Sequence, residues 1–113
     1  MRDLARIFQA LSDINRIRIL KMLEKRSLCV CEITDVLELA TSTVSKHLSI
    51  LRDTGFVTDA KDGKWVNYSL TESPPSPYID QLLPLFAKWL PDNKVVMEDE
   101  KKILSVDREK ICG

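Results

Sequence analysis

Residues 41–54 read TSTVSKHLSILRDT, and Gly55 follows them. Val44, Leu48 and Leu51 recur at helical spacing, so one face of this segment is apolar and the opposite face is polar. Glycine is common just past the end of a helix, because it adopts the left-handed conformation needed there at little cost. The segment therefore predicts a helix over residues 41–54 with one buried face.

Two β-prone runs follow this helix, over residues 56–61 and 64–70, and Asp62-Gly63 joins them. Asp-Gly between two such runs is the strongest short signal for a β-hairpin. The sequence therefore predicts a hairpin directly after the 41–54 helix.

Apolar residues at helical spacing predict three more helices on the N-terminal side, over residues 4–11, about 14–25 and about 30–37. Ser12 or Asp13 provides the N-cap of the second of these helices. Two short helices in succession followed by a hairpin form the pattern of a winged helix-turn-helix. In that motif the second helix of the pair enters the major groove of DNA.

The C-terminal part begins with residues 73–77, Ser-Pro-Pro-Ser-Pro, which predict a rigid linker. Residues 78–90 predict an apolar helix kinked near Pro84, and residues 94–111 predict a charged amphipathic helix. The expected fold is mostly α with a small β-hairpin, in the order α-α-α-α-β-β-α-α.

Composition narrows the class of protein. The chain has 113 residues, 44% of them hydrophobic, with 17 basic and 17 acidic side chains. This content excludes wholesale disorder, and the balanced charge excludes nucleic-acid binding by bulk positive charge. No apolar run predicts a signal peptide or a membrane span, so we expect a cytoplasmic protein. Three cysteines are an odd number, which argues against a disulfide scaffold.

The polar face of the 41–54 helix is suited to DNA. Small hydroxyl groups near a helix N-terminus allow close approach and can donate to phosphates or base edges, and lysine adds positive charge. The alternative is that these side chains only solvate a surface helix. The candidate DNA-binding residues are Ser42, Thr43, Ser45, Lys46, His47, Ser49 and Arg52 on the helix, with Lys61 and Lys64 at the hairpin tip.

Cys29 and Cys31 stand two positions apart at the start of the predicted 30–37 helix. On an ideal helix such residues lie about 200° apart, so they can share one ion only at a frayed helix start or with distortion of the helix. Soft thiolates suit Cd(II), Pb(II), Cu(I) and Zn(II). A buried structural pair and a redox-active pair remain alternatives, although the usual redox motif has two residues between the cysteines.

Three stretches in the expected order resemble the ArsR/SmtB family of metalloregulatory repressors: residues 10–20, residues 40–52 with the following Gly55, and residues 63–70. The resemblance implies a homodimer that binds an operator with dyad symmetry and represses transcription. Family dimers are built from the first and the last long helices.

Applied to this chain, the resemblance divides it into three segments. Residues 1–72 form the DNA-binding domain with its N-terminal dimer helix, residues 73–93 the linker and dimerisation helix, and residues 94–113 a charged C-terminal helix. The alternative for the apolar 78–90 helix is that it folds back on its own subunit.

The cysteine pair resembles the inducer site of the arsenical-resistance branch, which implies As(III) or Sb(III) as the inducer. In the fullest form of that motif a third cysteine follows three residues later, whereas this chain has Thr34 there. Cys112 is the remaining candidate for a third ligand. A Cd(II)- or Pb(II)-responsive repressor of the same family is the alternative.

No Gly-rich phosphate loop, Ser/His/Asp set or carboxylate pair is present in the sequence. We therefore expect no enzymatic activity and no organic cofactor. A thiol-redox protein and a winged helix that binds only protein are the remaining classes.

Overall fold

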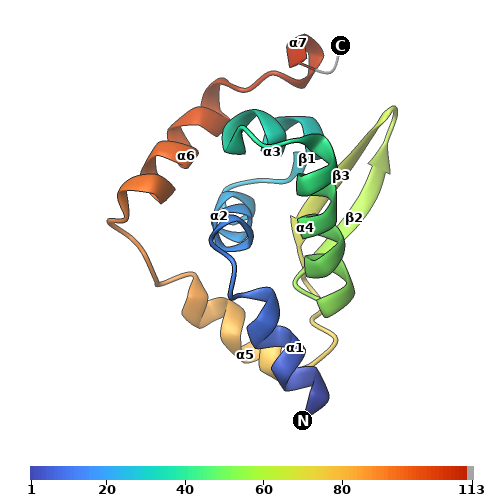
Figure 1. The fold of residues 1–113 in the computed structure, drawn as a ribbon, viewed down its shortest axis with the longest axis vertical. Coiled ribbons are helices and arrows are strands. Elements are labelled where there is room, and N and C mark those ends of the chain that lie inside the picture. Colours follow the sequence, from blue (N-terminus) through green and yellow to red (C-terminus); the bar gives the residue numbers. More distant parts are fainter. Residues whose placement is uncertain (112–113) are drawn as a thin grey trace.

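Short helices surround a central helix, and a small sheet closes one side of the molecule (Figure 1). The computed structural model describes residues 1–111. Its elements are α1 (Arg2–Ala10), α2 (Ile14–Leu23), β1 (Leu28–Cys29), α3 (Val30–Leu37), α4 (Thr41–Thr54), β2 (Val57–Asp62), β3 (Trp65–Leu70), α5 (Pro77–Phe86), α6 (Lys94–Ser105) and α7 (Arg108–Ile111).

The core forms where α2, α3, α4 and the sheet meet. Val44, Leu48 and Leu51 of α4 are fully buried, as their helical spacing predicted. They pack in one cluster with side chains such as Ile19 of α2 and Ile33 of α3. The predicted winged helix-turn-helix is therefore confirmed: α3 and α4 are the helix pair, and β2 and β3 form the wing, a name used below for residues 57–70.

The sheet has three antiparallel strands in the order β1-β3-β2. The sequence had predicted only the hairpin, because a strand of two residues shows no alternation of apolar and polar side chains. Cys29 of β1 pairs with Asn67 of β3. Asp62 pairs with Trp65, so the hairpin turn consists of residues 63–64 and begins one position later than predicted.

The helix predicted over residues 78–90 is shorter than expected, because α5 ends at Phe86. Pro91 disfavours helical backbone at the residue before it, and Leu90 has a left-handed φ of 61°. The buried Lys21 ammonium donates to the carbonyl oxygens of Phe86 at 3.1 Å and Trp89 at 2.8 Å. It thereby satisfies carbonyl groups at the end of α5 and just after it that a continuing helix would have used.

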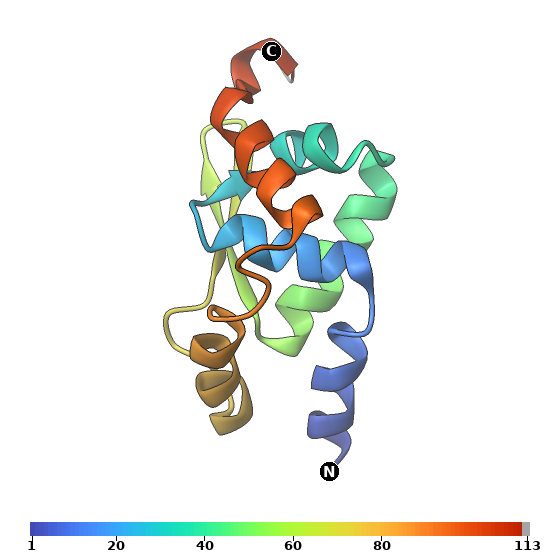
Figure 2. The same ribbon diagram turned by 90° about the vertical axis from the view of Figure 1, so that its left-hand side faces the viewer.

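Residues 94–111 form two helices instead of the single one predicted. Val106 has extended backbone (ψ 130°), which ends α6 before the short α7 begins. α6 lies across α2 (Figure 2), and the buried Asp99 carboxylate receives two hydrogen bonds from Arg18, at 2.8 and 2.9 Å. None of the helices in residues 1–111 combines the length and the apolar character needed to cross a bilayer.

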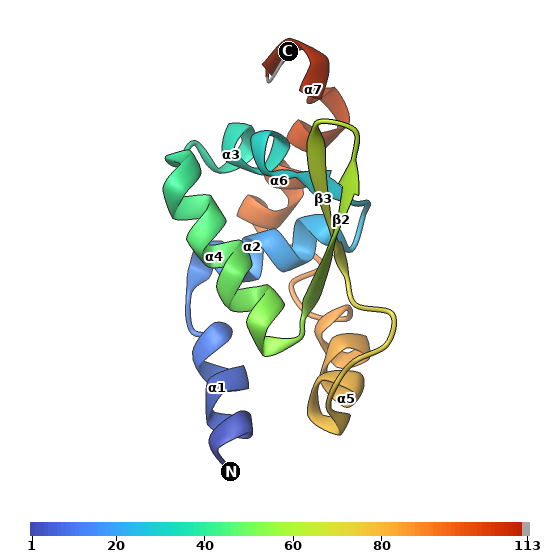
Figure 3. The same cartoon turned by 90° about the vertical axis from the view of Figure 1, so that its right-hand side faces the viewer.

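α1 and α5 project from the same end of the molecule (Figure 3). Both leave large apolar side chains exposed beyond those that they bury. The exposed side chains are Phe8 on α1, Tyr78 and Leu85 on α5, and Trp89 just after α5.

Candidate functional site

The outer face of α4 presents most of the predicted DNA-binding residues to solvent. No side chain of residues 1–111 caps the N-terminus of α4, which begins after Ala40. The first backbone N–H groups of α4 thus remain available to an acceptor such as a phosphate. Ser42, Thr43, Lys46, Arg52, Lys61 and Lys64 are exposed, and Ser45, His47 and Ser49 are half-buried.

His47 is held by a neighbour that the sequence did not single out. Arg16 Nη1 lies 3.1 Å from His47 Nδ1, and because a guanidinium can only donate, the ring nitrogen is the acceptor. The same guanidinium donates to the carbonyl oxygens of Ala10 at 2.7 Å and Gln9 at 3.2 Å, both at the end of α1. Arg16 therefore fixes the position of α4 relative to α1.

Two of the predicted cationic side chains have partners on the protein surface. Arg52 pairs with Asp59 at 3.1 Å and with Asp53 at 3.6 Å. The Lys64 ammonium lies 4.8 Å from the centre of the Trp65 ring. The two carboxylates partly neutralise the Arg52 charge, whereas Lys61 and Lys64 lie exposed beside the hairpin turn.

The cysteine pair lies at the junction of β1 and α3. Cys29 is the N-cap residue of α3 and has extended backbone (φ −88°, ψ 168°), and Cys31 lies in the first turn of the helix. The side chain of Cys29 is 1% exposed and that of Cys31 is half-buried. Cys31 is disulfide-bonded in this structure, so a pair of free thiols at this junction requires reduction.

Glu32 organises this junction. Its Oε1 accepts from the Cys29 backbone N–H at 3.0 Å and from Arg108 at 2.9 Å, and its Oε2 accepts from Arg26 at 3.1 Å. Burial alone would raise the pKa of Glu32, but these hydrogen bonds outweigh it and hold the pKa below its usual value. Burial raises the pKa of the Cys29 thiol; the Glu32 carboxylate adds to the rise, although the Glu32 backbone N–H opposes it.

The described residues supply two soft ligands at this site. Thr34, at the position of the family's third cysteine, donates its hydroxyl to the carbonyl oxygens of Val30 at 2.6 Å and Cys31 at 3.0 Å. Among residues 1–111, no three His, Cys, Asp or Glu side chains come together to hold an ion. Cys112, the candidate third ligand, lies outside the described residues.

Sequence reasoning missed the side chains that join the cysteines to the wing. Arg108 Nη2 donates to Asn67 Oδ1 at 2.8 Å as well as to Glu32. The spacing Cys29-x-x-Glu32 is a capping-box pattern and could have marked Glu32 as the residue that caps α3. No local pattern could have marked Arg108, because its partners lie 41 and 76 positions away.

Comparison with known proteins shows which family this chain resembles. Residues 13–59 match the family described as "Bacterial regulatory protein, arsR family". The arsenical resistance operon repressor of Escherichia coli is 36% identical over 96 residues, which cover 84% of this chain and 74% of the relative. A cadmium resistance transcriptional regulatory protein CadC homolog of Staphylococcus aureus is 41% identical over 71 residues. That match covers 62% of this chain but only 59% of the relative, which is less than two thirds of its length.

Solved structures agree with the fold. Reduced HlyU from Vibrio cholerae superposes with a TM-score of 0.62 at 31% identity, covering 74% of this chain and 84% of HlyU. A homodimeric winged helix-turn-helix DNA-binding domain from Mycobacterium bovis has a TM-score of 0.63 at 24% identity, covering 74% of each chain. The second likeness concerns the fold alone. The chain therefore belongs to the arsR family of bacterial regulatory proteins, which are DNA-binding transcriptional regulators and not enzymes.

Proposed function

We propose that this chain represses a metalloid-resistance operon as a homodimer and leaves its operator when As(III) or Sb(III) binds the thiolates of Cys29 and Cys31. The supporting observation is the position of the two cysteines, which stand on either side of the step from β1 into α3. Cys29 has extended backbone and not helical backbone, so the separation of about 200° on an ideal helix does not apply to the pair. The helical backbone therefore does not by itself hold the two thiols on opposite faces of α3.

The DNA-binding part of the proposal assigns α4 to the major groove and the wing to the backbone. The uncapped N-terminus of α4 and its hydroxyl side chains suit phosphates and base edges. The proposed contacts on the helix are Ser42, Thr43, Ser45, Lys46, His47, Ser49 and Arg52, and those on the wing are Lys61 and Lys64.

The dimer part of the proposal uses the apolar side chains of α1 and α5 that lie exposed at one end of the molecule. In this division residues 1–72 bind DNA and contribute the first dimer helix, residues 73–93 contribute the second, and residues 94–113 form the C-terminal segment. A regulator of this kind acts inside the cytoplasm.

The ligand set of the proposed site is incomplete within residues 1–111. Trivalent arsenic and antimony favour soft thiolate ligands, and Cys29 and Cys31 supply two. Cys112 or a thiol from solution would supply the third.

Release from DNA tests this proposal. An operator fragment is selected from random duplex DNA, and its dissociation is followed by fluorescence anisotropy as arsenite, antimonite, Cd(II), Pb(II) or Zn(II) is added. A phosphine reductant keeps Cys31 reduced without offering a thiol to the ion. We expect arsenite and antimonite to release the wild-type protein from the operator. Neither ion should release Cys29→Ser or Cys31→Ser.

The variant Cys112→Ser separates the sources of the third ligand. If Cys112 is the ligand, this variant should respond to arsenite only when glutathione is added. Release by Cd(II) or Pb(II) alone would favour the cadmium-responsive alternative, which the 41% identity to the S. aureus relative makes the second candidate. Release by none of the ions would contradict the inducer while leaving the DNA-binding part intact.

A further inference from the structure

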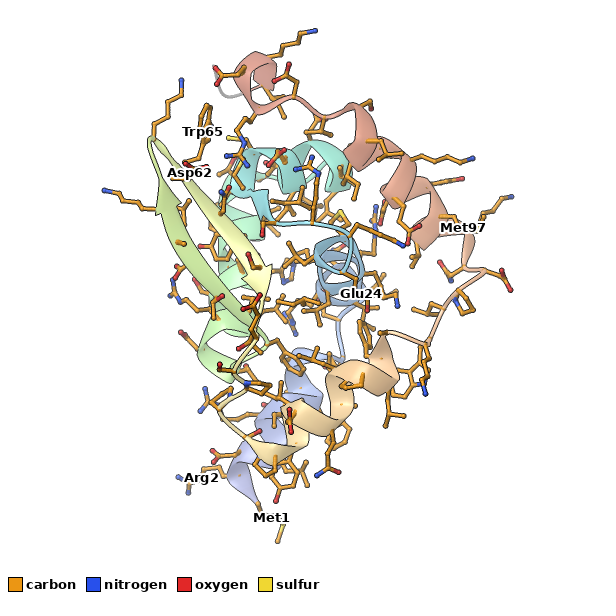
Figure 4. The ribbon with its side chains drawn as sticks, turned by 180° about the vertical axis from the view of Figure 1, so that it is seen from behind. Met1, Arg2, Glu24, Asp62, Trp65 and Met97 are labelled. Atoms are coloured by element: carbon orange, nitrogen blue, oxygen red, sulfur yellow. The ribbon has the colours of Figure 1, made fainter. Side chains whose placement is uncertain are left out.

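Arg108 joins three parts of the molecule with one side chain. Its Nη2 donates to Glu32 Oε1 at 2.9 Å and to Asn67 Oδ1 at 2.8 Å, and its Nη1 lies 3.6 Å from the Asp62 carboxylate. The guanidinium also lies 5.0 Å from the centre of the Trp65 ring. Figure 4 shows Asp62 and Trp65 at the end of the wing, on the side of α7. α7, the start of α3 and the wing therefore meet at Arg108.

The segment that bears Arg108 is itself anchored to the body of the protein. The fork between Arg18 and Asp99 fixes α6 on α2. Arg26 donates to the carbonyl oxygen of Ile103 at 3.0 Å and to Glu32 at 3.1 Å, which fixes the end of α6 beside α3. Arg108 therefore follows a helix, α6, that is anchored to both α2 and α3.

The outer part of the wing depends on such a contact. β1 pairs with β3 only through Leu28 and Cys29, opposite Tyr68 and Asn67. Beyond Asn67 the wing is a two-stranded ribbon, and an isolated ribbon of this kind is only marginally stable in water. Arg108 contacts the ribbon in this outer part.

One buried polar group of the wing is unsatisfied. The indole N–H of Trp65 is shielded from solvent and finds no acceptor among residues 1–111. An unpaired buried donor opposes the arrangement that buries it.

We propose that Arg108 is the positioning residue of the wing: it holds the hairpin in register with the first turn of α3 and transmits a rearrangement of that turn to the wing. The route is short, because Glu32 Oε1 accepts from both the Cys29 backbone and Arg108. An ion that drew Cys29 and Cys31 together would move the Cys29 backbone and with it the Glu32 carboxylate. The proposal has a positioning half, in which Arg108 holds the hairpin, and a transmission half, in which it passes a rearrangement of α3 to the wing. The transmission half rests on the proposed function, since it requires an inducer at the cysteines.

The positioning half is tested without DNA or inducer. Arg108→Gln is compared with Lys110→Gln, which removes the same charge from the same helix at an exposed position. Both are made in a Trp89→Phe background, so that Trp65 is the single tryptophan. Emission of Trp65 and hydrogen exchange of amides 57–70 are measured on chains that thermal unfolding shows to be folded.

We expect Arg108→Gln to shift Trp65 emission to longer wavelength and to speed exchange in the wing by about tenfold, because charge-assisted hydrogen bonds are lost. Lys110→Gln should match the background. Arg108→Lys keeps the charge but not the fork, so it should fall between the two. If Trp65 emission and the exchange of amides 57–70 are the same in Arg108→Gln and Lys110→Gln, the proposal is overturned.

The transmission half is tested on operator binding, with arsenite as the probe. Arsenite should lower the operator affinity of wild type and Lys110→Gln by the same factor, and that factor should be smaller in Arg108→Gln by about threefold or more. An equal factor in Arg108→Gln overturns transmission. If arsenite does not release the wild type, the proposed function fails and transmission fails with it, while the Trp65 measurements still decide the positioning role.

Discussion

Asp13 fixes the start of α2 through a hydrogen bond that its carboxylate accepts from the Arg16 backbone N–H at 3.1 Å. Burial alone would raise the pKa of Asp13, but this hydrogen bond and the nearby His47 and Arg16 side chains hold the pKa below its usual value. A carboxyl group whose pKa is lowered by folding stabilises the fold at pH values above its unfolded pKa. That contribution is lost as the pH falls through the lower, folded pKa.

Substitution of this N-cap should therefore have a pH-dependent cost. We expect Asp13→Ala to lower the free energy of unfolding by about 1 kcal/mol at neutral pH, and Asp13→Asn to lower it by less, because asparagine also caps. Urea unfolding at pH 7 and at about pH 3 measures the difference from wild type, which should shrink in acid. A loss in Asp13→Ala that is the same at both pH values would show that the carboxylate charge contributes nothing.

Two glycines end elements in the left-handed region, and their surroundings differ. Gly55 (φ +105°) ends α4, and a Cβ added there would clash with the ring of Pro75. Gly63 (φ +62°) begins the hairpin turn, and an added Cβ would meet open space. The proline linker thus packs on the end of the DNA-binding helix, whereas the hairpin turn is free of such contacts.

Alanine at the two positions should separate backbone strain from steric clash. Gly63→Ala should cost about 1 kcal/mol, from left-handed backbone alone. Gly55→Ala should cost more than about 2 kcal/mol, because Pro75 must also move. Chemical denaturation of both variants measures the difference, and equal losses would mean that the linker yields freely.

Sequence periodicity predicted the elements whose contacts are local. The helices over residues 30–37 and 41–54 have the predicted bounds, because helical spacing of apolar side chains and the glycine after α4 are encoded within a few residues. β1 was missed because its pairing with Asn67 depends on a segment far along the chain. The same applies to the site: cysteines at close spacing are visible in sequence, whereas the contact between Glu32 and Arg108 exists only in the folded molecule.

Assembly of two copies is a property of the complete molecule, and it should depend on the end where α1 and α5 project. Leu85 on α5 is 49% exposed and Leu104 on α6 is 85% exposed, so the two permit a matched comparison. We expect Leu85→Glu to weaken dimerisation by roughly a hundredfold, because a carboxylate would be buried at the proposed contact. Leu104→Glu should leave the dimer intact.

Sedimentation equilibrium over a range of protein concentrations measures this difference. The operator affinity of Leu85→Glu should fall together with dimerisation, since a dyad-symmetric site needs both copies. A dimer that survives Leu85→Glu but not Leu104→Glu would move the contact to α6.

The fork between Arg18 and Asp99 spans 81 positions of the chain, and this has a consequence for the order of folding. During synthesis α2, α3, α4 and the wing emerge before Asp99 exists, so the winged helix must begin to form without its α6 cover. Contacts made after the rate-limiting step affect unfolding more than folding. We expect Asp99→Asn to speed unfolding in stopped-flow denaturant jumps by tenfold or more, about 1.4 kcal/mol, and to leave the folding rate nearly unchanged. The C-terminal segment would then pack last during folding, and its contacts would slow unfolding and so set the lifetime of the folded regulator.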